Sequence, residues 1–244
     1  MNTMNLNEYK ELLSAAFGSN GYPEMLEDAA AEKFYTFSNL LVDTNKRFNL
    51  TAITDEKEIM LKHFVDCASI APHIPKGATL IDIGCGAGFP TIPIAILRKD
   101  VQVTALDSTQ KRIDFVNLAA KTLNLQNVTG VCARAEEFAL THRETFDVCT
   151  SRAVARLNIL AELCVPLIKL GGSFIAMKSQ KADEEYAEAR EGVSKLGCSL
   201  ILNQQDFFSH QGIDTERKLL VFKKERGTPK EFPRRYSQII KKPL

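Results

Sequence analysis

The chain has 244 residues, of which 45% are hydrophobic, 25% charged and 8% aromatic, and these fractions are typical of a soluble globular protein. Its 31 basic and 30 acidic residues leave a net charge of +1, so no overall basic excess points to nucleic acid. The length predicts one large domain, or one domain with a small subdomain.

The six cysteines predict free thiols rather than disulfides or a zinc site, because no pair has C-x-x-C spacing. The N-terminal stretch MNTMNLNEYKELL carries acidic residues where a signal peptide needs a basic and then an apolar stretch. No apolar run approaches the ~20 residues that span a bilayer. We therefore expect a reduced, cytoplasmic protein with no metal and no membrane partner. The cysteines are Cys67, Cys85, Cys132, Cys149, Cys164 and Cys198.

Helical patterns occupy the first part of the chain. Apolar residues recur at helical spacing over residues 6–16, again after Pro23, and again after Thr54-Asp55, whose side chains are suited to cap a helix. The pattern changes at the turn Pro75-Lys-Gly77. These features predict a helical N-terminal subdomain over residues 1–75.

From residue 79 onward, short apolar segments alternate with amphipathic helical stretches. The short segments are almost wholly apolar, as expected of parallel strands covered by helices on both faces. A late pair of strands joined by a polar segment predicts an antiparallel hairpin at the sheet edge. Together they predict a doubly wound α/β domain over residues 76–244. The predicted strands are Thr79–Ile83, Val101–Leu106, Val128–Cys132, Phe146–Thr150, Ser173–Met177, Ser199–Leu202 and Lys218–Phe222, and the predicted helices are Pro90–Leu97, Gln110–Leu123, Leu157–Leu170 and Ala182–Leu196.

A glycine-rich turn follows the first predicted strand. The segment Thr79–Pro90 (TLIDIGCGAGFP) runs directly into Gly84-x-Gly86-x-Gly88. Glycines at such a turn permit a tight bend and the close approach of a ligand to the backbone. The segment therefore predicts a ligand site at the end of this strand.

The residues around the turn indicate which ligand it takes. A dinucleotide fingerprint needs glycine at position 89, where this chain has Phe89, and Pro90 lacks the N–H that a pyrophosphate would use. Asp82 disfavours a phosphate and favours a cationic group. A cofactor with a sulfonium, an ammonium and a ribose but no phosphate fits these residues, and S-adenosylmethionine is such a cofactor.

Two further polar elements follow the next two predicted strands. Asp107 and Ser108 end the second strand, nineteen positions after the last glycine of the turn, where an acidic residue commonly binds ribose hydroxyls. Arg134-Ala135-Glu136 follows the third strand, where a backbone N–H and a carboxylate commonly read the adenine. Each element alone is also explained by a tight loop, a helix cap or a structural carboxylate. Their order and spacing favour a cofactor site.

Eight segments spread over nearly the whole chain carry a family resemblance. They are Phe48–Ile53 (FNLTAI), Lys62–Asp66 (KHFVD), Asp82–Pro90 (DIGCGAGFP), Asp107–Arg112 (DSTQKR), Arg134–Glu136 (RAE), Ser151–Val154 (SRAV), Ala176–Lys178 (AMK) and Phe232–Tyr236 (FPRRY). On these segments the sequence resembles the RsmG (GidB) family of bacterial 16S rRNA (guanine-N7) methyltransferases. Cys67 stands where the family usually has serine, and Cys85 occupies the small second position of the glycine loop.

The resemblance implies a class I S-adenosylmethionine-dependent methyltransferase fold that acts on N7 of a guanine in 16S rRNA, with S-adenosylhomocysteine as product. It also implies a monomer whose partner is 16S rRNA, the 30S subunit or an assembly intermediate. Matched residue by residue, it implies cofactor contacts at Gly84, Phe89, Ala135, Glu136 and Arg152.

The expected chemistry needs no general base. Guanine N7 has an in-plane lone pair and no proton to lose, so transfer depends on collinear positioning of the reacting atoms. The chain has neither the D/N-P-P-Y/F segment of amino-methylating enzymes nor the Pro-Cys dipeptide of 5-methylcytosine enzymes. We therefore assign no catalytic base and expect Arg152 to order the cofactor pocket and to contact RNA.

Basic residues are concentrated near the C-terminus, where residues 217–244 hold ten Lys/Arg against two Asp/Glu and are interleaved with aromatic residues. Phosphate contacts combined with stacking are typical of RNA binding, so we expect salt-dependent affinity. For any single residue, solvated surface charge is the simpler interpretation. The predicted RNA-binding residues are Lys111, Arg112, Arg134, Arg156, Lys178, Arg217, Lys218, Arg234 and Arg235.

Some alternatives remain open at this point. His63 and Asp66 are three positions apart on one helix face, where they either fix the N-terminal subdomain to the sheet or serve the substrate. An NAD-dependent oxidoreductase accounts for the sheet and Asp107 but not for Phe89-Pro90. A non-catalytic RNA-binding protein accounts for the basic segment but not for the glycine turn.

Overall fold

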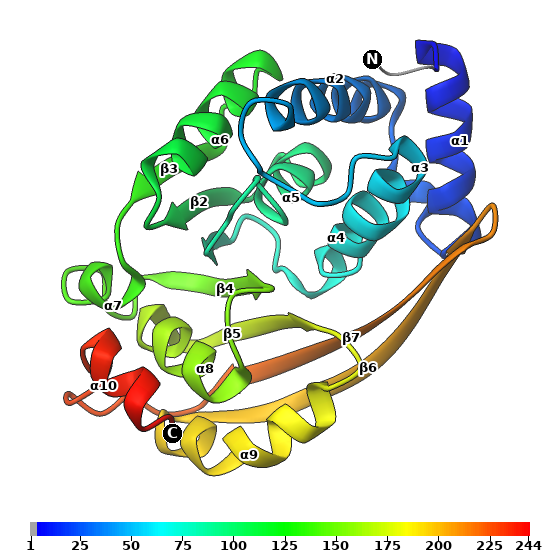
Figure 1. Ribbon diagram of the computed structural model, residues 1–244. Helices are drawn as coiled ribbons and strands as arrows, with labels where there is room; N and C mark the ends of the chain where they lie inside the picture. The colour runs from blue at the N-terminus through cyan, green and yellow to red at the C-terminus, as the bar shows by residue number, and fades with distance from the viewer. Residues whose placement is uncertain (1–3) are drawn as a thin grey trace.

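Within residues 4–244, which the computed structural model describes, seven strands form one sheet in the order β3-β2-β1-β4-β5-β7-β6 (Figure 1). The pairs β3–β2, β2–β1, β1–β4 and β4–β5 are parallel, while β5–β7 and β7–β6 are antiparallel. This arrangement confirms the doubly wound α/β fold with a C-terminal hairpin. The strands are β1 (Thr79–Ile83), β2 (Gln102–Asp107), β3 (Val128–Cys132), β4 (Phe146–Arg152), β5 (Ile168–Lys178), β6 (Cys198–His210) and β7 (Ile213–Lys224).

Helices cover both faces of the sheet and create two hydrophobic cores. The N-terminal helices pack with α5 and α6 on one face, and α7 to α10 pack on the other (Figure 1). Alternation along β1 sends Leu80 into the first core and Ile81 into the second. The helices are α1 (Leu6–Ser19), α2 (Asp28–Asn45), α3 (Glu56–Ile59), α4 (Asp66–Ala68), α5 (Thr91–Leu97), α6 (Gln110–Thr122), α7 (Ala135–Phe138), α8 (Leu157–Cys164), α9 (Ala182–Lys195) and α10 (Tyr236–Lys241).

Aromatic packing joins the N-terminal helices to the rest of the fold. Phe37 of α2 lies 5.9 Å from Phe64, 5.4 Å from Phe89 of the glycine turn and 6.3 Å from Phe115 of α6, measured between ring centroids. These rings are buried, so the helices and the sheet share one core on this face. The predicted N-terminal subdomain therefore packs against Phe89 of the glycine turn. Residues 1–3 of that prediction lie outside the described residues.

Three elements differ from the sequence prediction. The helix expected over residues 157–170 ends at Cys164, because Pro166 lies in a 3-10 turn and the chain enters β5 at Ile168. The third N-terminal helix is divided by a π-helical turn at Met60–Val65. The C-terminal strands are also longer than predicted.

The hairpin of β6 and β7 extends as far as the N-terminal helices. Its tip lies beside α1 (Figure 1), where Ser209 N donates to Asn20 Oδ1 at 3.0 Å and Asn20 Nδ2 donates to Ser209 O at 3.1 Å. Along β6 exposed and less exposed positions alternate because one face of the hairpin is open to solvent, and Asn203–Asp206 and Asp214–Lys218 are runs of polar residues. These polar runs made residues 203–217 resemble a polar connection.

Candidate functional site

A cavity of about 1060 Å³ lies at the carboxyl ends of β1, β2, β4 and β5. Small-molecule sites commonly occupy roughly 300–1,000 Å³, so the space admits a cofactor together with part of a second ligand. Carboxyl strand ends are where open α/β sheets bind ligands. The wall includes eight of the ten residues predicted to bind a cofactor, namely Gly84, Gly86, Phe89, Asp107, Ser108, Ala135, Glu136 and Arg152.

The glycine turn leaves free space at one position only. A Cβ atom on Gly84 would lie 2.3 Å from Val154 Cγ2, and one on Gly88 would lie 2.8 Å from Ile92 Cγ1. At Gly86 the nearest atom would be the Gly84 carbonyl oxygen, at 3.8 Å. Gly84 and Gly88 are therefore required by the packing of the protein itself. Gly86 leaves the cavity wall bare, as a ligand that approaches the backbone requires.

Asp107 ties the glycine turn to the end of β2. Its Oδ2 accepts from Gly86 N at 3.1 Å and from Arg112 Nη1 at 3.2 Å, while its Oδ1 accepts from Thr109 N at 2.9 Å. A carboxylate offers about four acceptor positions, so one remains for a ribose hydroxyl. The helix-capping and ligand-binding interpretations of Asp107 are compatible. Ser108, next in the chain, is exposed at the same wall.

Ala135 and Glu136 lie at the start of α7, in the part of the cavity wall that follows β3 in the chain. Ala135 is buried and Glu136 half-buried. Their position at the end of a third strand agrees with the predicted contact to a base, which remains a prediction.

Asp82 lies beneath the glycine turn, outside the cavity wall. It is fully buried, and its Oδ2 accepts from Thr91 N at 3.3 Å and from Thr91 Oγ1 at 2.7 Å at the start of α5. Burial raises the pKa of Asp82 to about 7. Its position indicates a structural role at the base of the turn, and its predicted cofactor contact is not seen among the cavity-lining residues. Gly88 also lies outside that wall.

The raised pKa of Asp82 gives a pH-dependent stability. Between its unfolded pKa near 3.8 and about 7, unfolding releases the proton that the folded state retains, so raising the pH favours the unfolded state. We expect the free energy of unfolding of the wild type to fall by a few kcal/mol relative to Asp82→Asn between pH 4 and pH 7. Urea denaturation of both proteins at several pH values measures the difference. If the free energies of unfolding of the two proteins changed in parallel with pH, the raised pKa of Asp82 would be contradicted.

A buried carboxylate holds two guanidinium groups at the wall opposite α7. Asp66 Oδ2 accepts from Arg152 Nη1 at 3.1 Å and from Arg217 Nε at 3.2 Å, and Asp66 itself is buried. The Arg152 guanidinium also lies 5.0 Å from the centroid of the Phe89 ring. The cluster carries one net positive charge and joins the N-terminal helices to β4 and β7.

His63 lies beside this cluster. Its ring stacks on Phe89 with centroids 4.3 Å apart, and its Nε2 lies 3.2 Å from Thr51 Oγ1. Burial, aided by the charge of Arg152, lowers the pKa of His63 to about 3, so the imidazole is neutral at pH 7. His63 and Asp66 link the N-terminal helices to the sheet and also line the cavity, and a role toward the substrate stays a prediction.

The predicted RNA-binding residues separate into two groups. Arg112, Arg134, Arg156, Lys178 and Arg217 line the cavity, whereas Lys111, Lys218, Arg234 and Arg235 lie outside its wall. Several are paired within the protein: Lys178 with Glu185 at 2.8 Å, Lys218 with Asp183 at 2.7 Å and Arg156 with Glu188 at 2.6 Å. Arg234 donates through Nε to the fully buried Glu162 at 2.8 Å.

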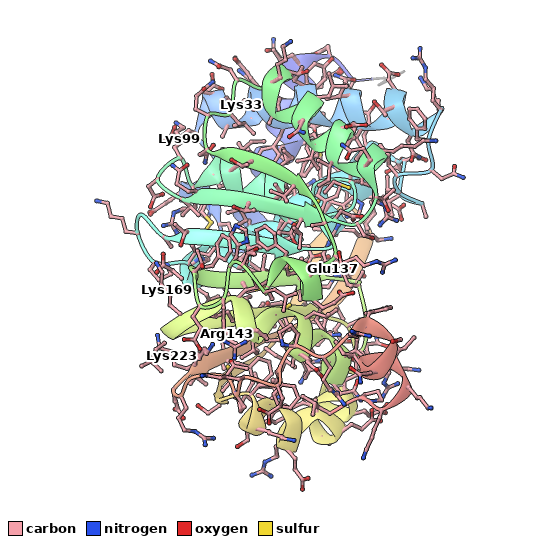
Figure 2. The ribbon with its side chains drawn as sticks, turned by 90° about the vertical axis from the view of Figure 1, so that its left-hand side faces the viewer. Lys33, Lys99, Glu137, Arg143, Lys169 and Lys223 are labelled. Carbon is pink, nitrogen blue, oxygen red and sulfur yellow. The ribbon has the colours of Figure 1, made fainter. Side chains whose placement is uncertain are left out.

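The basic C-terminal segment does not form one surface. In the antiparallel ladder of β5 and β7, Lys218 lies opposite Lys178 at the carboxyl end of β5. Lys223 lies opposite Ser173, five residues nearer the amino end of β5. Figure 2 shows Lys223 on the same side of the molecule as Lys99 and Lys169, where strands begin. Lys224 is buried against Glu144. The charge excess of this segment therefore lies partly away from the cavity.

Several residues of the cavity wall were not predicted from the sequence. Leu50, Thr51, Lys62 and Tyr236 line it although none was assigned to the site. The signal for all four was present, since FNLTAI, KHFVD and FPRRY were among the segments of the family resemblance. What was missing was the long-range packing that brings the N-terminal helices over the strand ends.

No helix within residues 4–244 is long and apolar enough to cross a membrane. In the same part of the chain, no group of three or more His, Cys, Asp or Glu side chains is arranged to hold a metal ion.

Comparisons with known proteins identify relatives over most of the chain. Residues 30–208 match the family model GidB, described as rRNA small subunit methyltransferase G. Ribosomal RNA small subunit methyltransferase G of Clostridium perfringens (strain 13 / Type A) is 42% identical over 97% of this chain and 99% of its own. The Staphylococcus carnosus protein of that name is 43% identical over 90% of this chain and 92% of its own. TYW2 of P. horikoshii, solved in complex with MeSAdo, shares the fold at a TM-score of 0.54 and 12% identity, covering 66% of this chain and 62% of that one.

Proposed function

The chain belongs to the rRNA small subunit methyltransferase G (GidB) family, and we propose that it transfers the methyl group of S-adenosylmethionine to N7 of one guanine in 16S rRNA. Family membership supports rRNA methylation with this cofactor. The choice of N7 is what the family resemblance implies, and the groups of the cavity are compatible with it. We also propose that the protein acts as a cytoplasmic monomer on the 30S subunit or an assembly intermediate.

The observation that carries the proposal is the bare backbone at Gly86 beside the carboxylate of Asp107. A cofactor at this wall finds space at the glycine turn and a free acceptor position on Asp107. Ala135 and Glu136 complete the wall where a base would lie. When bound, S-adenosylmethionine supplies a methyl group made electrophilic by its sulfonium charge.

The titratable groups of the cavity are suited to positioning rather than to proton removal. Asp66 is neutralised by two guanidinium groups, and the Asp107 carboxylate already accepts three hydrogen bonds. His63 is neutral and hydrogen-bonded to Thr51. Guanine N7 has no proton to lose, so an acceptor of this kind needs only to be held in line with the donor. Arg152 and Arg217 provide positive charge suited to an RNA phosphate.

The test offers labelled S-adenosylmethionine to 30S subunits, naked 16S rRNA and transfer RNA. We expect label in 16S rRNA, and strand scission at N7-methylguanine to map it to one nucleotide. Calorimetry is expected to show binding of S-adenosylhomocysteine but not of NAD. Label on an exocyclic nitrogen or a ribose would contradict the N7 assignment. Binding of NAD would favour the oxidoreductase alternative, and RNA binding without transfer would favour the non-catalytic one.

A further inference from the structure

The loop between α2 and α3 presents an aromatic ring to solvent from a fixed backbone. Phe48 is 46% exposed. Its N–H donates to Thr44 O at 3.0 Å, and its carbonyl accepts from Leu50 N at 2.7 Å. A single exposed apolar residue is common and indicates nothing by itself. Phe48 differs from such a residue in the groups that surround it.

The side chain of Asn45, the last residue of α2, hydrogen-bonds to the backbone that follows Phe48. Its Oδ1 accepts from Leu50 N at 2.7 Å and from Thr51 N at 2.9 Å, and its Nδ2 donates to Thr51 O at 2.9 Å. Three hydrogen bonds from one amide hold the turn in a single shape. The ring of Phe48 is therefore presented without a large entropic cost on binding.

A cation lies over the exposed ring. Lys111 Nζ, in the first turn of α6, is 5.5 Å from the Phe48 ring centroid. Arg47 precedes Phe48 and Arg112 follows Lys111, and both are exposed. An exposed aromatic ring with a cation over it is suited to a partner that offers flat π faces and negative charge together. Unpaired RNA has both.

This ring stands at the edge of the cavity. Leu50 and Thr51, two and three residues after Phe48, line the cavity, and so does Arg112 on the facing helix. The loop leaves α2 close to α6 (Figure 1). Thr51 contacts His63, which stacks on Phe89 of the glycine turn. The loop is thus connected through side chains to the wall of the cofactor site.

We propose that Phe48 and Lys111 form a stacking site for an unpaired RNA base adjacent to the methyl acceptor. The inference rests on the proposed function and names a contact with its substrate. One base stacks on the ring while Lys111 and Arg112 face its phosphates. The acceptor base then reaches the cavity directly beside this contact. Because such stacking is made equally in the ground and transition states, it contributes to substrate affinity rather than to the rate of transfer.

The test compares Phe48→Ala, Phe48→Leu and Phe48→Tyr with the wild type in methylation of 30S subunits and of a 16S rRNA transcript. We expect Phe48→Ala and Phe48→Leu to raise KM for RNA about tenfold with kcat unchanged, and Phe48→Tyr to retain the wild-type KM. Leu118→Ala is the matched control, since Leu118 is 47% exposed on α6 and lies outside the cavity wall. Its KM should not change. Affinity for S-adenosylhomocysteine should be unchanged in all variants.

Three results would overturn the stacking site: an unchanged KM in Phe48→Ala, a Phe48→Leu protein as good as Phe48→Tyr, or a weakened S-adenosylhomocysteine affinity in Phe48→Ala. Fluorescence anisotropy with labelled 16S rRNA separates this inference from the proposed function. If the wild type transfers no methyl group to rRNA, the function fails. The stacking site is still judged by whether Phe48→Ala weakens RNA binding and Leu118→Ala does not.

Discussion

Replacement of Arg152 by alanine is expected to lower kcat/KM for rRNA methylation at least about 100-fold and to weaken S-adenosylhomocysteine binding. The guanidinium contacts Asp66, covers the ring of Phe89 and donates to the backbone carbonyl of Lys62 at 3.2 Å. Removal of one partner of a buried ion pair costs about 3–5 kcal/mol. Arg217 remains on Asp66, so we expect a stability loss at the lower end of that range. The protein should still fold, with its site rearranged.

Calorimetric titration with S-adenosylhomocysteine, steady-state methylation and thermal unfolding together measure this effect. Arg156→Ala is the control, since Arg156 also lines the cavity but forms an exposed ion pair with Glu188. Exposed pairs contribute little, so its unfolding temperature should stay near that of the wild type. Arg152→Lys should restore stability more than activity, because lysine keeps the charge but not the planar fork. If Arg152→Ala kept both cofactor affinity and methylation near wild type, Arg152 would have no role in the site.

The parallel part of the sheet was predictable because its central strands are mostly buried on both faces, and the partly exposed edge strand β3 follows the same alternation of strand and helix along the chain. Thr79–Ile83 and Val128–Cys132 were predicted with the bounds that the structure shows for β1 and β3. The glycine turn was equally predictable, because its three regularly spaced glycines come directly after a strand that the sequence shows clearly. In these segments local pattern and tertiary environment agree.

Contacts between distant parts of the chain were not predictable in the same way. Asp66 and Arg217 are 151 positions apart, and only the fold brings them onto one carboxylate. Asp82 illustrates the reverse case, since its place beside the glycines suggested a ligand contact while its side chain turns to Thr91 beneath them. The sequence shows which residue types are near the turn, but the direction of a strand side chain depends on the register of the sheet.

Charge counting along the sequence also has a physical limit. Residues 217–244 hold ten basic residues against two acidic ones, which suggested that this segment binds RNA. Arg217, Lys218, Lys224 and Arg234 instead form ion pairs with acidic residues elsewhere in the chain. The net charge of a segment does not show which of its charges are neutralised by residues elsewhere in the fold. The salt dependence of RNA binding is therefore expected to reflect the cavity-lining cations more than this segment as a whole.

Gly86→Ala is expected to weaken S-adenosylhomocysteine binding by about 10- to 100-fold or more, because its new methyl group takes the space that the glycine turn leaves for a ligand. Gly86 has φ of 55° and its Cβ would meet only a carbonyl oxygen at 3.8 Å. The substitution therefore causes no internal clash, and its cost to folding is the ~1–2 kcal/mol of a left-handed alanine. Calorimetric titration measures the affinity and urea denaturation measures the stability.

Gly212→Ala separates backbone strain from occupation of the site. Gly212 has φ of 79°, nothing lies within 4 Å of its Cβ position, and it stands in the turn between β6 and β7, away from the cavity wall. Both variants should lose a similar free energy of unfolding, while only Gly86→Ala loses cofactor affinity. Equal affinity in the two variants would mean that the cofactor does not approach the glycine turn. The bare backbone at Gly86 would then need another explanation. The assignment of Asp107 to the ribose would also lose its support.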